Sequence, residues 1–83
     1  MDRFDRIAQL HRIFRNHRLP VPLAEIKTQL ECSERTARRY IKFLQDYMGA
    51  PLEFDRIRNG WHYLDAPGGP FELPGFWFTP SEL

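Results

Sequence analysis

Only Glu31 and Cys32 separate two segments in which apolar residues recur at the three- and four-residue steps of a helix. One helix is predicted over residues 22–30 and another over 33–48. Their inward faces consist of Leu23, Ile26 and Leu30 in the first helix, and of Ala37, Ile41, Leu44 and Met48 in the second. So short a connection forces the two helices to cross steeply, which is the geometry of a helix-turn-helix pair.

Local signals set the boundaries of this pair. Pro22 is expected in the first turn of its helix, where its missing N–H is no loss. Ser33 is expected to cap the following helix, because its hydroxyl can accept a hydrogen bond from a free backbone N–H of the next turn. Gly49, followed closely by Pro51, is expected to end that helix after Met48.

A third amphipathic segment precedes the pair and is predicted to form a helix from Arg3 to about His17. Its buried stripe consists of Phe4, Ile7, Ala8, Leu10, Ile13 and Phe14. Pro20 and Pro22 interrupt this pattern, so the first and second helices are separate.

After Gly49 the pattern becomes alternating, which is typical of strands. Leu52 and Phe54 mark one strand, and Trp61 and Tyr63 mark another. Between them, Asn59-Gly60 supplies the positive φ that a tight hairpin turn needs. We expect both aromatic residues of the second strand to pack the hairpin onto the helices rather than to stack on bases. The predicted fold is mainly α with a small β-hairpin: a winged helix-turn-helix over residues 1–65, with a C-terminal extension.

The composition limits the chemistry that is available. With 83 residues, of which 42% are hydrophobic, the chain can build one small core. The single cysteine, Cys32, cannot close an internal disulfide and is expected to pack in the turn between helices. His11, His17 and His62 have no carboxylate, serine or cysteine partner at a spacing typical of a catalytic or metal site. The sequence therefore predicts no catalytic residue, no metal, no cofactor and no enzyme.

Positive charge is concentrated in the helical half and above all on the third predicted helix. The first 48 residues contain ten of the 12 Lys and Arg residues but six of the 11 Asp and Glu residues. A helical wheel places Arg35, Arg39 and Lys42 opposite the buried stripe of that helix, with Thr36 and Arg38 on the flanks. Arginine can donate two hydrogen bonds to guanine O6 and N7 in the major groove, and the free N–H groups near Ser33 can contact phosphate. The plain alternative is a solvated helix face.

The tip of the hairpin has a smaller positive cluster. Arg56, Arg58 and Asn59 lie where a wing would meet the sugar-phosphate backbone or enter the minor groove. The alternative interpretation is an ordinary polar turn, since Asp55 is adjacent.

The last 18 residues have a different character. Residues 66–70 resemble a linker. More aromatic and aliphatic surface follows than a free tail normally exposes, at Phe71, Leu73, Phe76, Trp77 and Phe78. Residues 79–82 then match the pattern of a capping box with proline at the first helical position. We expect residues 66–83 to be a linker or dimerisation segment that leads to a further C-terminal domain in a longer protein.

Three stretches resemble one family: residues 3–14, S-E-R-T-A-R-R-Y-I-K-F-L at 33–44, and P-L-E-F-D-R-I-R-N-G-W-H-Y-L at 51–64. They are similar to the N-terminal DeoR-type winged helix of WYL-domain bacterial transcriptional regulators, and residues 71–83 are similar to the segment that leads toward the WYL domain. The resemblance implies a dimer that reads a palindromic operator, with its two recognition helices ~34 Å apart. The aromatic tail is expected either to mediate self-association or to fold back on its own domain.

Two functional hypotheses follow. In the first, the chain is a DNA-binding module, most simply of a repressor, in which Arg35, Thr36 and Arg39 read bases. Phosphates are then held by Arg38, Lys42, Arg56 and Arg58. In the second, the chain is a protein-interaction winged helix that uses its basic face or its aromatic tail.

The sequence also predicts a compartment. No apolar run approaches the ~20 residues that cross a bilayer, and residues 1–6 lack the layout of a secretion signal. A cytoplasmic protein is expected, associated with the nucleoid when it is bound to DNA.

Overall fold

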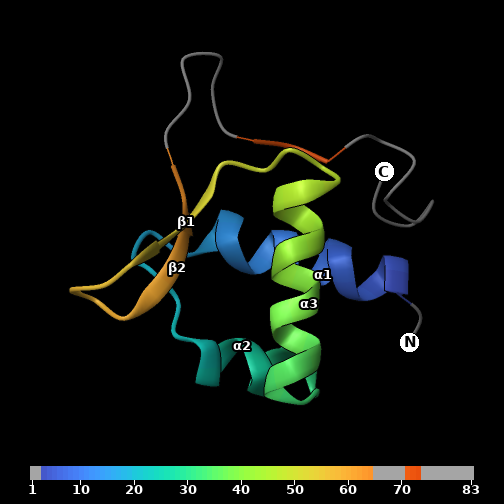
Figure 1. The fold of residues 1–83 in the computed structure, drawn as a ribbon, viewed down its shortest axis with the longest axis horizontal. Coiled ribbons are helices and arrows are strands. Elements are labelled where there is room, and N and C mark those ends of the chain that lie inside the picture. The colour runs from blue at the N-terminus through green and yellow to red at the C-terminus, as the bar shows by residue number, and fades with distance from the viewer. Residues whose placement is uncertain (1–2, 65–70, 74–83) are drawn as a thin grey trace.

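Three helices and a two-stranded hairpin make up the described part of the chain, as predicted (Figure 1). The computed structural model describes residues 3–64 and 71–73. The helices are α1 (Arg3–Asn16), α2 (Leu23–Leu30) and α3 (Glu34–Asp46), and the strands are β1 (Leu52–Asp55) and β2 (Gly60–Tyr63). Helix α1 contacts α2, α3 and β2, so it is the element against which the rest of the domain is assembled.

The core lies where the inner faces of the three helices meet. The predicted apolar stripes of α2 and α3 are buried at Ile26, Leu30, Ala37, Ile41 and Leu44. Helix α1 adds Ile7, Ala8, Leu10, Ile13 and Phe14, whereas Phe4, which was predicted in the same stripe, is exposed. Phe4 lies in the first turn, at the edge of the helix assembly.

The start of α2 differs from the prediction. Pro22 is the N-cap residue, with φ −64° and ψ 150°, and the first helical residue is Leu23. The cause lies one residue earlier: Val21 exchanges two backbone hydrogen bonds of 2.8 Å with Trp61 of β2. This bridge keeps the chain extended up to Pro22, so the helix can begin only after it.

Helix α3 begins as predicted and ends earlier. The Ser33 hydroxyl accepts a hydrogen bond of 3.2 Å from the Thr36 N–H, which confirms the cap. The helix ends at Asp46, two residues before Met48, and the chain reverses at Gly49, whose φ is +67°. The reversal uses carbonyls of the last turn, because the Ala50 N–H donates to the Leu44 carbonyl at 3.0 Å.

The hairpin pairs Leu52 with Tyr63 and Phe54 with Trp61 in antiparallel register. Asn59 has the expected positive φ of 55°, but Gly60 does not have a positive φ. Glycine is needed at position 60 for a different reason: a Cβ there would lie 2.8 Å from the backbone carbonyl carbon of Pro20. The segment before α2 therefore packs directly on the start of β2.

Aromatic contacts attach the hairpin to the helices, as predicted. Tyr63 and Phe14 lie with their ring centroids 5.3 Å apart, and both Trp61 and Tyr63 pack against the core. Within the C-terminal extension, Leu73 is buried in the same core and Phe71 packs against Tyr63, at 5.4 Å between ring centroids. Residues 71–73 therefore fold onto the domain. Phe76, Trp77, Phe78 and the predicted capping box at 79–82 lie outside the described residues.

Candidate nucleic-acid interface

The side of α3 that points away from the core is basic. Arg35, Arg38, Arg39 and Lys42 are exposed, while Thr36 at the flank is half-buried. The Arg35 and Arg39 side chains form neither an ion pair nor a hydrogen bond with any described residue. Two guanidinium groups one helical turn apart therefore point outward with all their donors available.

The other two cations of this face have acidic neighbours on the same helix. Arg38 lies 3.2 Å from a Glu34 carboxylate oxygen, and the Lys42 ammonium lies 3.3 Å from Asp46. The Arg38 and Lys42 side chains are 59% and 77% exposed, respectively, and exposed i,i+4 pairs contribute only about 0.3–0.5 kcal/mol. A phosphate can replace either carboxylate at little cost. The Lys42–Asp46 pair was not anticipated from the sequence.

The start of α3 offers backbone donors. The Ser33 hydroxyl is occupied by its capping bond, so this side chain shapes the helix end. The N–H groups of Glu34 and Arg35 form no hydrogen bond with the described residues. The Glu34 carboxylate lies in the same turn, however, and opposes an anion there.

The tip of the hairpin is held in a fixed shape by Asp55. One carboxylate oxygen of Asp55 accepts hydrogen bonds from the N–H groups of Ile57 and Arg58, at 2.9 and 3.0 Å. The bond from the Arg58 N–H is the main cause that lowers the pKa of Asp55 below its ordinary value. Asp55 therefore orders the turn from within, and Arg56, Arg58 and Asn59 are all exposed on it.

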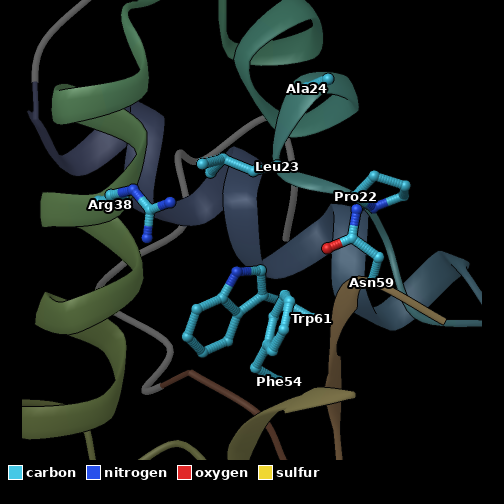
Figure 2. A pocket seen from close by; sticks show the side chains of 7 residues that line it. All are labelled: Pro22, Leu23, Ala24, Arg38, Phe54, Asn59 and Trp61. Atoms are coloured by element: carbon cyan, nitrogen blue, oxygen red, sulfur yellow. The ribbon is translucent and has the colours of Figure 1, made fainter. Parts of the chain in front are cut away.

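A cleft of about 430 Å³ lies between α3, the start of α2 and the hairpin. Its lining residues are Pro22, Leu23, Ala24, Arg38, Phe54, Asn59 and Trp61 (Figure 2). Sequence reasoning identified Arg38 and Asn59 as candidate contacts but placed neither in a cleft. Phe54 and Trp61 are cross-strand partners and so share a face, which is the signal that could have indicated their joint position.

A polar cluster around the buried His11 lies away from this face, between α1, β2 and the C-terminal extension. The His11 ring is 2% exposed; its Nδ1 lies 2.8 Å from the Tyr63 hydroxyl and its Nε2 lies 3.1 Å from a Glu72 carboxylate oxygen. Arg15 also donates to Glu72, at 3.1 and 3.3 Å. Burial lowers the pKa of His11 and exceeds the opposing effect of Glu72. A neutral His11 accepts from the Tyr63 hydroxyl and donates to Glu72.

These contacts make His11 a structural residue of the described domain. The other two histidines differ: His17 is exposed and contacts the Ile13 carbonyl at 2.7 Å through Nδ1, and His62 is half-buried in β2. Across residues 3–64 and 71–73, no group of three metal-ligating side chains comes together. Nor does any helix in this part of the chain combine the length and apolar character of a membrane span.

Comparison with known proteins agrees with this geometry. A family model described as an HTH domain matches residues 6–62, which include all three helices apart from the start of α1, and nearly the whole hairpin. No curated protein and no solved structure gives a significant match. The matched family is one of DNA-binding domains and not of enzymes. With more than half of its length matched, the chain belongs to the helix-turn-helix domain family.

Proposed function

We propose that the chain is the sequence-specific DNA-binding module of a transcriptional regulator, with α3 in the major groove of a duplex. The observation that carries this proposal is the pair of unpartnered, exposed arginines on α3, Arg35 and Arg39, opposite the buried stripe. Leaving two arginines without partners gives the folded chain no ion-pair stabilisation, whereas each can donate two hydrogen bonds to a guanine edge.

The two kinds of contact divide between two sets of residues. Arg35, Thr36 and Arg39 lie on the outward side and flank of α3 and would read base edges. Phosphates would be held by Arg38, Lys42, Arg56 and Arg58, of which the last two lie on the ordered hairpin tip. The tip would contact the backbone or enter the minor groove.

The resemblance to WYL-domain regulators extends the proposal to the whole protein. In that arrangement the chain would be the N-terminal part of a repressor that dimerises and reads a palindromic operator. Phe76, Trp77 and Phe78 would belong to the dimerisation segment, while Phe71 and Leu73 hold its beginning on the domain.

Two variants test the division of roles. A duplex selected from random oligonucleotides by the wild-type protein is compared with a scrambled duplex of the same length. Arg39→Ala should lose ~1–3 kcal/mol of binding free energy on the selected duplex and relax the preference at one base pair. Arg38→Ala should weaken binding to both duplexes alike. If both variants bind both duplexes as the wild type does, the assignment is wrong.

One observation favours a second candidate function, the docking of a protein partner. Phe43 and Tyr47 stack with ring centroids 5.0 Å apart near the end of α3, and Tyr47 is 80% exposed. An apolar partner could bind there. A titration at two salt concentrations separates the candidates, because phosphate neutralisation makes affinity fall steeply with salt and apolar docking does not.

A further inference from the structure

The cleft beside α3 contains donors that the contacts proposed above do not use. In Figure 2, Arg38 reaches in from α3, Leu23 and Ala24 lie at the start of α2, and the Trp61 ring of the hairpin lies opposite Arg38 and Leu23. The cleft thus lies between the helix proposed for the major groove and the wing proposed for the backbone or minor groove. A DNA strand that passes from one to the other must cross it.

Trp61 presents a free donor to this cleft. Its indole N–H has no hydrogen-bond partner among the described residues, and in Figure 2 its ring nitrogen lies on the side that faces Arg38 and Leu23. Indole N–H can only donate, so it matches an acceptor. The Trp61 indole N–H is therefore available to an acceptor in the cleft.

Arg38 adds charge to the same place. Its Nε and one terminal nitrogen face Glu34, each at 3.2 Å. A guanidinium group has five N–H donors in one plane, so several remain for a second acceptor. Arg38 can therefore bind an anion in the cleft even while it contacts Glu34.

The start of α2 completes the donor set. The Pro22 carbonyl accepts from the N–H groups of Glu25 and Ile26, and Pro22 provides no side-chain cap. The N–H groups of Leu23 and Ala24 therefore have no partner among the described residues. They are two further neutral donors on residues that line the same cleft.

The remaining lining of the cleft is apolar and selects the kind of anion. Phe54 meets Trp61 edge to face, with ring centroids 5.3 Å apart, and Pro22 and Leu23 form the opposite wall. A free inorganic phosphate would leave this surface without a partner. A phosphodiester linked to deoxyribose has acceptor oxygens for the donors and a largely apolar sugar for the walls.

We propose that this cleft binds one phosphodiester of the DNA backbone, with Trp61 and Arg38 both donating to its oxygens and the adjoining sugar packing on Phe54. This inference rests on the proposed function and adds to it a DNA contact by Trp61. It also explains how the position of the wing relative to α3 is fixed on the duplex: one phosphate is held from both sides.

Neutralising single phosphates tests the proposal. A selected duplex is prepared as a series in which one phosphate at a time is replaced by an uncharged methylphosphonate. Affinities are measured for the wild type, Trp61→Phe and Arg38→Gln, with unfolding curves to establish that the variants fold. Trp61→Phe retains a six-membered aromatic ring against Phe54 and loses the pyrrole part of the indole with its N–H.

We expect Trp61→Phe to lose about tenfold in affinity for the unmodified duplex, the loss typical of a hydrogen bond to a charged group. On the duplex neutralised at one particular position the same substitution should have almost no effect. Arg38→Gln, on the exposed side of α3, should also lose its effect on affinity when that same phosphate is neutralised. Lys42→Gln is the matched control. Lys42 lies outside the cleft, so the effect of this substitution should disappear when a different phosphate is neutralised.

Three results would overturn the inference: wild-type affinity of Trp61→Phe, an equal loss on every neutralised duplex, or different phosphates for Trp61→Phe and Arg38→Gln. If Trp61→Phe does not fold, Trp61 fluorescence is measured instead in a Trp77→Phe background. The quenching of Trp61 by DNA should then be lost on the same neutralised duplex on which Arg38→Gln has no effect, and a different duplex would overturn the inference. Failure of the wild type to bind any duplex contradicts the proposed function itself, which is a distinct outcome.

Discussion

Helices α1 and α3 both have arginines on their outer sides, but these arginines differ in what they contact. On α1, Arg6 donates to the Leu30 carbonyl at the end of α2, and Arg15 donates to Glu72 of the C-terminal extension. On α3, the Arg35 and Arg39 side chains contact no described residue through hydrogen bonds or ion pairs. Arginines of the first kind connect parts of the fold, and those of the second kind are available to a partner.

The difference follows from where each helix lies. Helix α1 crosses behind α3 and contacts α2, α3 and β2 (Figure 1), so its flanking side chains meet other elements. The outward side of α3 meets none of them. Substitutions on α1 should therefore change stability, and substitutions on the outer side of α3 should change binding.

The largest effect is expected inside α3 itself. Leu44 is fully buried, and Leu44→Ala should lower the free energy of unfolding by ~2–5 kcal/mol, because the lost methyl groups leave a cavity. Arg35→Ala, on the opposite side of the same helix, should change it by less than about 0.5 kcal/mol. Urea denaturation of both variants measures the contrast. Equal destabilisation would mean that the outer side of α3 is packed.

The next largest effect is expected from a comparison of one arginine on α1 with one on α3. Arg6→Ala should lower the free energy of unfolding by about 1.5 kcal/mol, since the Leu30 carbonyl loses a charged donor at a half-buried site. Its DNA affinity, measured under conditions where the variant is folded, should match the wild type. Arg39→Ala should show the reverse pattern. The comparison fails if Arg6→Ala weakens binding and leaves stability unchanged.

A smaller effect is expected at the start of α3. Ser33→Ala removes the acceptor of the Thr36 N–H and should cost about 1 kcal/mol of stability. Ser33→Asp is the matched control, because aspartate is also a good N-cap and should retain most of the stability. Its added negative charge should weaken DNA binding, so the two variants separate capping from phosphate contact. Loss of stability in both would argue against the cap.

The smallest expected effect is a pH dependence that arises from the α1 side. The pKa of His11 in the folded chain lies below its ordinary 6.5, so the unfolded chain binds the proton more readily. The free energy of unfolding should therefore fall as the pH drops below 6.5. Well above pH 6.5 the contribution of His11 is complete and no longer changes with pH. The pKa of Glu72 is also lowered, chiefly by its hydrogen bond from His11, and adds a loss below 4.5.

His11→Gln should flatten the upper part of this pH profile and also reduce the part due to Glu72, because the hydrogen bond from His11 is the main cause of the lowered pKa of Glu72. Urea denaturation at a series of pH values measures both slopes. DNA affinity should not follow the His11 step, because the cluster lies away from the outer side of α3. An unchanged slope between pH 6.5 and 4.5 in the variant would exclude His11 as its origin.

Local pattern was sufficient to predict most of the fold. Helical periodicity placed Ala37, Ile41 and Leu44 inward and Arg35 and Arg39 outward, and the cap at Ser33 was also read correctly. These features depend on residues within one or two turns of each other, which a sequence displays directly.

The features that were missed depend on contacts between distant residues. The bridge from Val21 to Trp61 moved the start of α2, and the close approach of Pro20 determined the role of Gly60. The His11–Glu72 contact and the cleft at Trp61 likewise join segments that are far apart in the chain. Spacing along a sequence contains no direct sign of such contacts.

Methylation interference at guanine N7 tests the central claim most directly, because N7 lies on the major-groove edge that Arg39 is proposed to contact. A selected duplex is methylated sparsely, and the bound fraction is analysed for the wild type and for Arg39→Ala. The account predicts at least one guanine whose methylation prevents wild-type binding and no longer affects Arg39→Ala. Identical interference patterns for the two proteins, or interference by minor-groove methylation alone, would contradict it.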